Sequence, residues 1–194
     1  NPGPRRARMD VPPFELERFF AEYEHEADIM LAESGIRSLP ADRFDLDPGE
    51  LGYVIPTNGD PDLRASIGAR YDRGPEEVLL TVGTQEANFV LYSSLLDRGD
   101  HAVVVTPTYQ ALHSLPETIA DVTRVDLEPP EWTLDLDRVA EAIRPETKLL
   151  VLNNPNNPTG RYHDPETVQA LYELARDNEA YLHADEVYRL LAAD

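Results

Sequence analysis

The sequence predicts an α/β fold in three layers, with a mostly parallel sheet covered by helices on both faces and an N-terminal helical arm in front of it. From about residue 59 onward, short apolar segments alternate with helical segments. The longest apolar runs, Ala102–Val105 and Leu149–Leu152, are uninterrupted, as in strands buried on both faces. We expect two parts: residues 1–58 as an arm and crossover segment, and residues 59–194 as the beginning of a larger domain.

The arm is expected to contain a helix over roughly residues 13–33. Apolar residues recur there at spacings of three and four, and Ser34-Gly35 ends the pattern. The members of this apolar face are Leu16, Phe19, Phe20, Tyr23, Ala27, Met30 and Leu31. Residues 36–59 contain several Pro and Gly without a period, which predicts a loop or crossover.

The remaining elements alternate along the chain. Asp60-Pro61 and Asp164-Pro165 each pair a helix cap with Pro at the first helical position. Helices are expected at 60–71, 84–96, 135–143 and 164–178, a short helix or loop at 108–116, and strands at 78–82, 101–105, 122–127, 149–152 and 180–184. This order favours right-handed βαβ units, in which ligands bind at the carboxyl ends of the strands.

Composition excludes several classes of partner. The net charge is −20, with 37 acidic against 17 basic residues spread along the chain, so the surface repels nucleic acid and anionic membranes. No apolar run approaches the roughly 20 residues of a membrane span, and Asn1–Arg8 shows no secretory signal. No cysteine is present for disulfides or thiolate metal sites. We expect a cytoplasmic protein from a halophile; an ordinary acidic protein is the alternative.

Two motifs follow strands in the first half of the predicted sheet. Gly83-Thr84-Gln85 joins a predicted strand to a helix N-terminus, where backbone N–H groups and the helix dipole favour a phosphate; a plain tight turn is the alternative. Thr106-Pro107-Thr108-Tyr109 follows the next strand, and Tyr109 there could stack on a flat ring or simply pack against the protein.

Two stronger motifs follow later strands. Asn153–Gly160, with the sequence NNPNNPTG, is a rigid turn that directs amide side chains at a ligand or serves structure alone. Asp185 ends an apolar strand, where a carboxylate is costly unless a cation or strong donors pair with it. A protonated pyridine nitrogen is one such partner, and a helix N-cap is the alternative. His183 shares the strand face of Asp185 and is expected to be a packed core residue or a support for the site.

Together these motifs resemble the fold-type-I pyridoxal-phosphate (PLP) aminotransferases of class I/II. The resemblance covers about Tyr53 to Arg189. It rests on Tyr53 followed by the Gly59–Arg64 segment, and on Gly83–Ala87, Gly99-Asp100, Pro107–Tyr109, Asn157–Gly160 and Asp185–Arg189. It implies that residues 59–194 begin the PLP-binding large domain, and that the substrates are an amino acid and a 2-oxo acid.

The resemblance also implies roles for single residues. Asp185 would hold the pyridinium proton, so that the ring accepts electrons from the substrate Cα. Asn157 and Tyr188 would hydrogen-bond the ring's phenolic oxygen, and Tyr109 would stack on the ring. The phosphate would be bound by three consecutive residues, Gly83, Thr84 and Gln85. Tyr53 would reach the phosphate of the neighbouring subunit, implying a homodimer, and Gly35 would lie by the substrate carboxylate.

The family also needs a lysine that binds PLP covalently, and Lys148 is the only lysine here. Lys148 begins a strand, roughly 15 Å from the strand's carboxyl end at ~3.3 Å per residue, so it cannot serve. We therefore expect an N-terminal fragment without catalytic residues of its own. Alternatives are a lyase or cyclising synthase of the same fold and a non-catalytic PLP-binding module. A nucleotide-binding domain is disfavoured because no Gly-x-Gly-x-x-Gly or Walker loop occurs.

Overall fold

The computed structural model describes residues 10–45 and 57–191. Residue contacts divide the chain into two compact units. One unit combines the residues up to Met30 with those from Ala87 onward, and the other runs from Leu31 to Glu86.

The first unit is built on a four-stranded parallel sheet in the order β2-β1-β3-β4. The strands are β1 (His101–Thr106), β2 (Asp121–Asp126), β3 (Thr147–Asn153) and β4 (Tyr181–Asp185). The helices of this unit are α1 (Glu15–Tyr23), α3 (Thr84–Leu95, from Ala87 onward), α4 (Gln110–Glu117), α5 (Leu136–Ala142), α6 (Pro165–Asp177) and the 3-10 helix η4 (Arg189–Leu191). The predicted parallel α/β class is confirmed.

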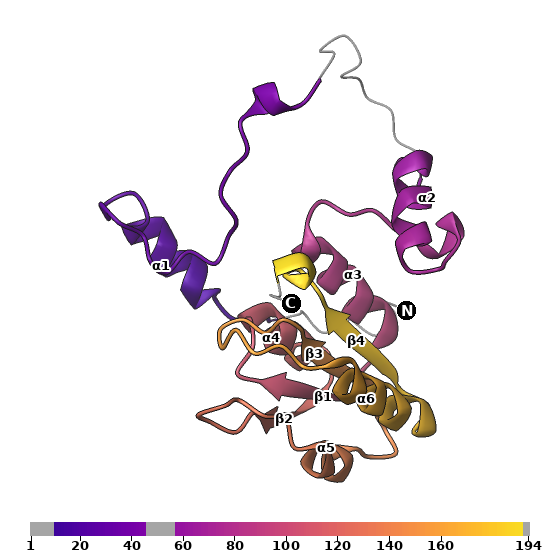
Figure 1. Ribbon diagram of the computed structural model, residues 1–194. Coiled ribbons are helices and arrows are strands. Elements are labelled where there is room, and N and C mark those ends of the chain that lie inside the picture. The colour runs from indigo at the N-terminus through magenta and orange to yellow at the C-terminus, as the bar shows by residue number, and fades with distance from the viewer. Residues whose placement is uncertain (1–9, 46–56, 192–194) are drawn as a thin grey trace, which may run out of the picture. The chain divides into compact units, whose positions relative to one another are not determined.

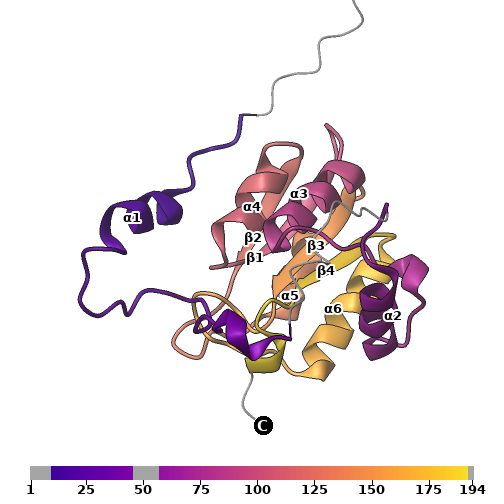
Figure 2. The same ribbon diagram turned by 90° about the horizontal axis from the view of Figure 1, so that it is seen from above.

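Helices cover both faces of the sheet, with α3 and α4 on one side and α5 and α6 on the other (Figures 1 and 2). Alternate residues of β1 divide between two apolar cores. Val103 and Val105 pack toward α5 and α6, whereas Ala102 and Val104 pack toward α3 and α4. Both faces of the central strands are thus buried, which explains why their sequence is apolar without alternation.

The amino ends of the strands are linked by a buried histidine. The two ring nitrogens of His101 lie 2.7 Å from the Thr147 hydroxyl on β3 and 2.8 Å from the Thr123 hydroxyl on β2. Burial and the nearby charge of Arg144 lower the pKa of His101, so the ring is neutral at pH 7. Lys148 also lies at this end of β3, exposed to solvent and far from the strand's last residue.

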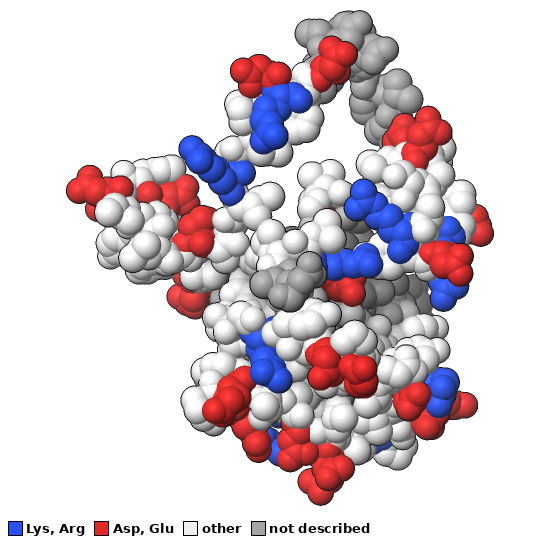
Figure 3. Space-filling view, in the orientation of Figure 1, with Lys and Arg blue, Asp and Glu red and all other residues white. Residues whose placement is uncertain are grey.

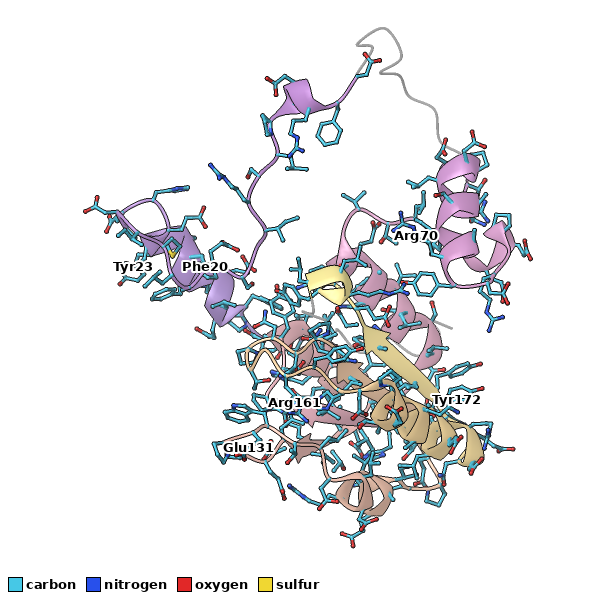
Figure 4. The ribbon with its side chains drawn as sticks, viewed as in Figure 1. Phe20, Tyr23, Arg70, Glu131, Arg161 and Tyr172 are labelled. Carbon is cyan, nitrogen blue, oxygen red and sulfur yellow. The ribbon has the colours of Figure 1, made fainter. Side chains whose placement is uncertain are left out.

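α1 is shorter than the predicted helix over 13–33. It ends at Tyr23, and Glu22, Glu24 and Glu26 crowd its C-terminal end with no basic residue in the last turn, a pattern that opposes the helix dipole. Its aromatic side chains pack against one another: the ring centroids of Phe19 and Tyr23 are 4.9 Å apart. Phe20 and Tyr23 are labelled on this helix in Figure 4.

The second unit contains α2 (Pro61–Arg70), the 3-10 helices η1 (Ala41–Arg43) and η3 (Pro75–Glu77), and the beginning of α3. The Asp60 side chain caps α2 by accepting from the Leu63 N–H, as predicted. The predicted strand at 78–82 is wrong. No strand forms among the described residues of this unit, so the segment lacks a pairing partner, and Val82 is 92% exposed.

Candidate functional site

The candidate site lies at the carboxyl edge of the sheet. Because the four strands are parallel, their last residues all lie at this edge: Thr106, Asp126, Asn153 and Asp185 (Figure 1). Side chains tie neighbouring strands together there. The Thr106 hydroxyl donates to Asp126 Oδ1 at 2.6 Å, linking the ends of β1 and β2.

Asp185 is a buried carboxylate with neutral hydrogen-bond donors. The residue is 5% exposed. Oδ2 accepts from the Asn88 amide at 3.3 Å, and Oδ1 accepts from the Val187 backbone N–H at 3.2 Å. In the part of the chain that the structure describes, no Lys or Arg forms an ion pair with it. A buried carboxylate held only by neutral groups is suited to a ligand that brings a positive charge, such as a protonated ring nitrogen.

Asn157 and Tyr188 are in contact with each other near the end of β4, the strand that carries Asp185. The Asn157 amide donates to the Tyr188 hydroxyl at 3.2 Å. Asn153 connects the pair to Asp185: its Oδ1 accepts from the Asn157 N–H at 2.7 Å, and its Nδ2 donates to the Asp185 carbonyl at 3.0 Å. Amide and phenol groups of this kind suit an anionic ring oxygen.

The remaining asparagines of the loop have a different task from the one we expected. The Asn154 side chain both accepts from and donates to the backbone of His163, at 2.9 and 3.0 Å. Asn156 donates to the Pro107 carbonyl at 3.1 Å, fastening the loop to the end of β1. Of the loop's asparagines, Asn157 alone makes a side chain–side chain hydrogen bond with another predicted site residue. Asn153 contacts the backbone of Asp185 and Asn157, while Asn154 and Asn156 hold the loop in place.

Tyr109 lies between the end of β1 and the start of α4. Its hydroxyl donates to Glu17 of α1 at 3.2 Å, and its ring lies 5.6 Å from the ring of Phe14. Gln110 fastens the same arm, because its amide accepts from the Glu15 N–H at 3.0 Å and donates to the Pro13 carbonyl at 2.9 Å. Residues 13–17, at the start of α1, therefore pack directly against Tyr109 and Gln110.

The predicted phosphate-binding residues lie in the second unit. Gly83 has a φ of +84°, which glycine adopts without strain, and it directly precedes α3. Thr84 and Gln85 form the exposed first turn of this helix, where the dipole favours an anion. Gly35 also lies in this unit, and its N–H donates to the Glu33 carboxylate at 2.6 Å. Tyr53 lies outside the described residues.

Sequence reasoning missed the residues beneath Asp185. Asn88 and Tyr92 are buried on α3, and the Tyr92 hydroxyl lies 3.0 Å from Nδ1 of His183 on β4. Burial and the charge of Asp185 raise the pKa of Tyr92, and burial lowers the pKa of His183, so both rings are neutral at pH 7. Their spacing of four on a predicted helix was the available signal.

A buried acidic residue and an amide–phenol pair at the carboxyl edge of a parallel sheet define a class of ligand-binding α/β protein. Sequence comparison narrows the class. The sequence model of the family Aminotransferase class I and II matches residues 22–194, and the chain belongs to that family. Members of the family are pyridoxal phosphate enzymes.

Curated relatives agree with this assignment. The aspartate/prephenate aminotransferase of Thermus thermophilus is 38% identical over 78% of this chain and 41% of its own length. A probable aspartate aminotransferase of Methanocaldococcus jannaschii is 34% identical over 77% of this chain and 41% of its own length. Capreomycidine synthase of Streptomyces vinaceus is 30% identical over 95% of the chain and 51% of its own length. The chain thus spans about half the length of these relatives or less.

Solved structures show the same fold. A PLP-dependent aminotransferase from Streptococcus suis superposes with a TM-score of 0.79 at 29% identity, over 91% of this chain and 51% of that one. Aspartate aminotransferase from Thermus thermophilus with maleate gives a TM-score of 0.64 at 34% identity, over 66% of this chain and 36% of its own.

Within the described residues, no cluster of His, Asp or Glu is arranged for a metal ion. No helix described here is long and apolar enough to cross a membrane.

Proposed function

We propose that the full-length protein containing this chain is a PLP-dependent aminotransferase acting on an amino acid and a 2-oxo acid. The observation that carries the proposal is Asp185, a buried carboxylate without a cationic partner among the described residues, at the carboxyl edge of β4. When bound, PLP supplies a ring that accepts electrons from the substrate Cα. Asp185 holds the proton of the ring nitrogen, and this charge-assisted bond keeps the ring electron-poor.

The other predicted residues fit the same assignment. Asn157 and Tyr188 bind the phenolic oxygen of the ring, which their mutual contact supports. Tyr109 packs against one ring face, and the first turn of α3, with Gly83, Thr84 and Gln85, binds the phosphate. Gly35 borders the substrate carboxylate.

The rest of the enzyme is supplied from outside these residues. Lys148 lies at the amino end of β3, so the lysine that binds PLP covalently belongs to another part of the protein. We further propose a homodimer in which Tyr53 reaches the partner's phosphate, and a halophilic, cytoplasmic setting in keeping with the net charge of −20.

A synthase of the same fold is the second candidate function. The observation that favours it is the match to capreomycidine synthase over 95% of the chain, against 77–78% for the aminotransferases above. Because that match leaves out only about 5% of the chain, it includes most of residues 1–58. We prefer the aminotransferase activity because relatives from Methanocaldococcus jannaschii, Thermus aquaticus and Thermus thermophilus carry aminotransferase names.

Absorbance of the full-length protein with added PLP tests the cofactor. We expect a visible band that borohydride removes, and amino-group transfer from aspartate, the donor suggested by the relatives' names, to 2-oxoglutarate. A protein with no such band is not a PLP enzyme. A protein with the band that converts amino acids without forming a new amino acid from the oxo acid is the synthase or lyase instead.

A further inference from the structure

The carboxylate of Asp185 lies on a small buried polar cluster contributed by α3 and β4. Asn88 and Tyr92 are four residues apart and share one face of α3, and His183 and Asp185 are two apart and share one face of β4. The two pairs meet in register: Asn88 with Asp185 at 3.3 Å, and Tyr92 with His183 at 3.0 Å. Asn88 is 2% exposed, and Tyr92 is completely buried.

This polar cluster lies in surroundings where apolar side chains would also pack. Tyr92 belongs to the same apolar core as Leu96, Ala102 and Leu149. A buried amide gains little net stability over an apolar residue of similar size, because it loses its hydration when the chain folds. The position of Asn88 is therefore better explained by what it does to Asp185 than by stability.

The chemistry of the donors distinguishes this cluster from an ion pair. An Arg or Lys beneath Asp185 would orient the carboxylate but would also neutralise it. Asn88 donates one hydrogen bond to Oδ2 and the Val187 N–H donates one to Oδ1, so both oxygens are oriented by uncharged groups. The nearby Tyr92 and His183 rings add no charge either. The full negative charge stays available for a cationic ring nitrogen.

We infer that Asn88 is a positioning residue, which fixes the plane of the Asp185 carboxylate against the ring nitrogen of the cofactor without neutralising it. The inference rests on the proposed function, and it assigns to α3 a part in the electronic tuning of the cofactor. It acts through Asp185 and needs no contact between Asn88 and the cofactor itself.

Asn88→Leu in the full-length protein tests the inference. Leu has a similar volume but donates no hydrogen bond, so the carboxylate loses its donor at Oδ2. Loss of a hydrogen bond to a charged group should weaken PLP binding by about 10-fold or more in an absorbance titration. The circular dichroism of the cofactor's visible band should change as well, because it reports how the ring is held. Asn88→Ser, too short to reach Oδ2, should show the same two effects if the Leu variant does not fold.

Ser114→Ala is the matched control. Ser114 is buried on α4, and its hydroxyl has no hydrogen-bond partner among the described residues. This variant should keep wild-type PLP affinity and dichroism. Asn88 variants that fold and match Ser114→Ala in both readouts would overturn the inference while leaving the proposed function intact. Failure of the wild-type protein itself to bind PLP would instead overturn the proposed function.

Discussion

At the scale of single residues, the charge of Asp185 is what the proposed chemistry needs, and its shape alone is not enough. Asp185→Asn keeps the shape and removes the charge, whereas a carboxylate moved by one methylene, as in Asp185→Glu, keeps the charge in the wrong place. We expect the full-length Asn variant to bind PLP through its remaining contacts while turnover falls by about three orders of magnitude, because the charge-assisted bond to the ring is lost. The Glu variant should be intermediate. Steady-state kinetics measure both.

Asp164→Asn provides a matched control for this prediction. Asp164 caps α6 by accepting from the Thr167 N–H at 2.8 Å, and Asn caps a helix about as well as Asp. The control should retain wild-type turnover. Wild-type turnover in Asp185→Asn as well would show that Asp185 is structural.

At the scale of elements, the side chain of Gln110 helps to hold the start of α1 against the sheet unit. Gln110 makes two hydrogen bonds to the backbone around the start of α1, to Glu15 and Pro13. Gln110→Leu removes both, each worth about 1 kcal/mol, so α1 should detach more often. We expect faster tryptic cleavage after Arg18, which lies within α1, measured by mass spectrometry.

Gln169→Leu is the matched control for the arm. Gln169 is exposed on α6 and donates to Glu173 within its own helix. Cleavage after Arg18 should be unchanged in this variant. Equal rates in the wild-type protein and Gln110→Leu would show that the ring contact of Phe14 with Tyr109 is sufficient to hold the arm.

Elements differed in how far the sequence determined them. The helices after Asp60 and Asp164 could be predicted because the cap and the proline act locally. Strands β1 and β3 could be predicted because burial on both faces requires apolar runs. The segment at 78–82 has the same apolar character, but a strand also needs a neighbour, and that depends on distant chain.

The site shows the same division. Asn157, Tyr188 and Asp185 could be proposed because Asp185 ends β4, and Asn157 and Tyr188 come a few residues after the ends of β3 and β4. Asn88 could not be assigned from the sequence, because its role depends on α3 facing the end of β4. The roles of Asn153 and Asn156 likewise depend on which strands are neighbours.

At the scale of the whole molecule, the acidic surface should make stability depend on salt. Acidic side chains are distributed over the visible face with arginines among them (Figure 3). Repulsion among 37 acidic residues opposes folding, and salt screens it with a Debye length of about 10 Å at 0.1 M. The melting temperature should rise clearly between low salt and molar KCl in a thermal scan. An unchanged melting temperature would contradict a halophilic origin.

Four histidines should make the molecule sensitive to mild acid. Burial is the main cause that lowers the pKa of His101, His113, His163 and His183 in the folded state. The unfolded chain therefore binds protons below about pH 6.5 while the folded chain does not. The stability that the neutral histidines contribute is complete above that pH. It is lost as the pH falls toward the pKa values of these histidines in the folded state.

Urea unfolding measured between pH 7.5 and 5 should show that the free energy of unfolding decreases as the pH falls. His101→Gln, which still hydrogen-bonds but does not titrate, should reduce that slope. A slope equal to that of the wild-type protein would show that His101 contributes nothing to the acid response.

Because β1 and β3 are buried on both faces, polar side chains must fix the register of these strands. In a sheet with one solvent-exposed face, a shift of the strand register by one residue moves apolar side chains into solvent and is therefore destabilising. Here a slip would only exchange one apolar face for another. Hydrogen bonds at the two ends of the strands fix the alignment. At the amino ends, His101 bonds to Thr147 and Thr123. At the carboxyl ends, Thr106 bonds to Asp126 and Asn153 bonds to Asp185. A change at His101, at the far edge of the sheet, would therefore reach the site as a misalignment of the strand ends that carry it.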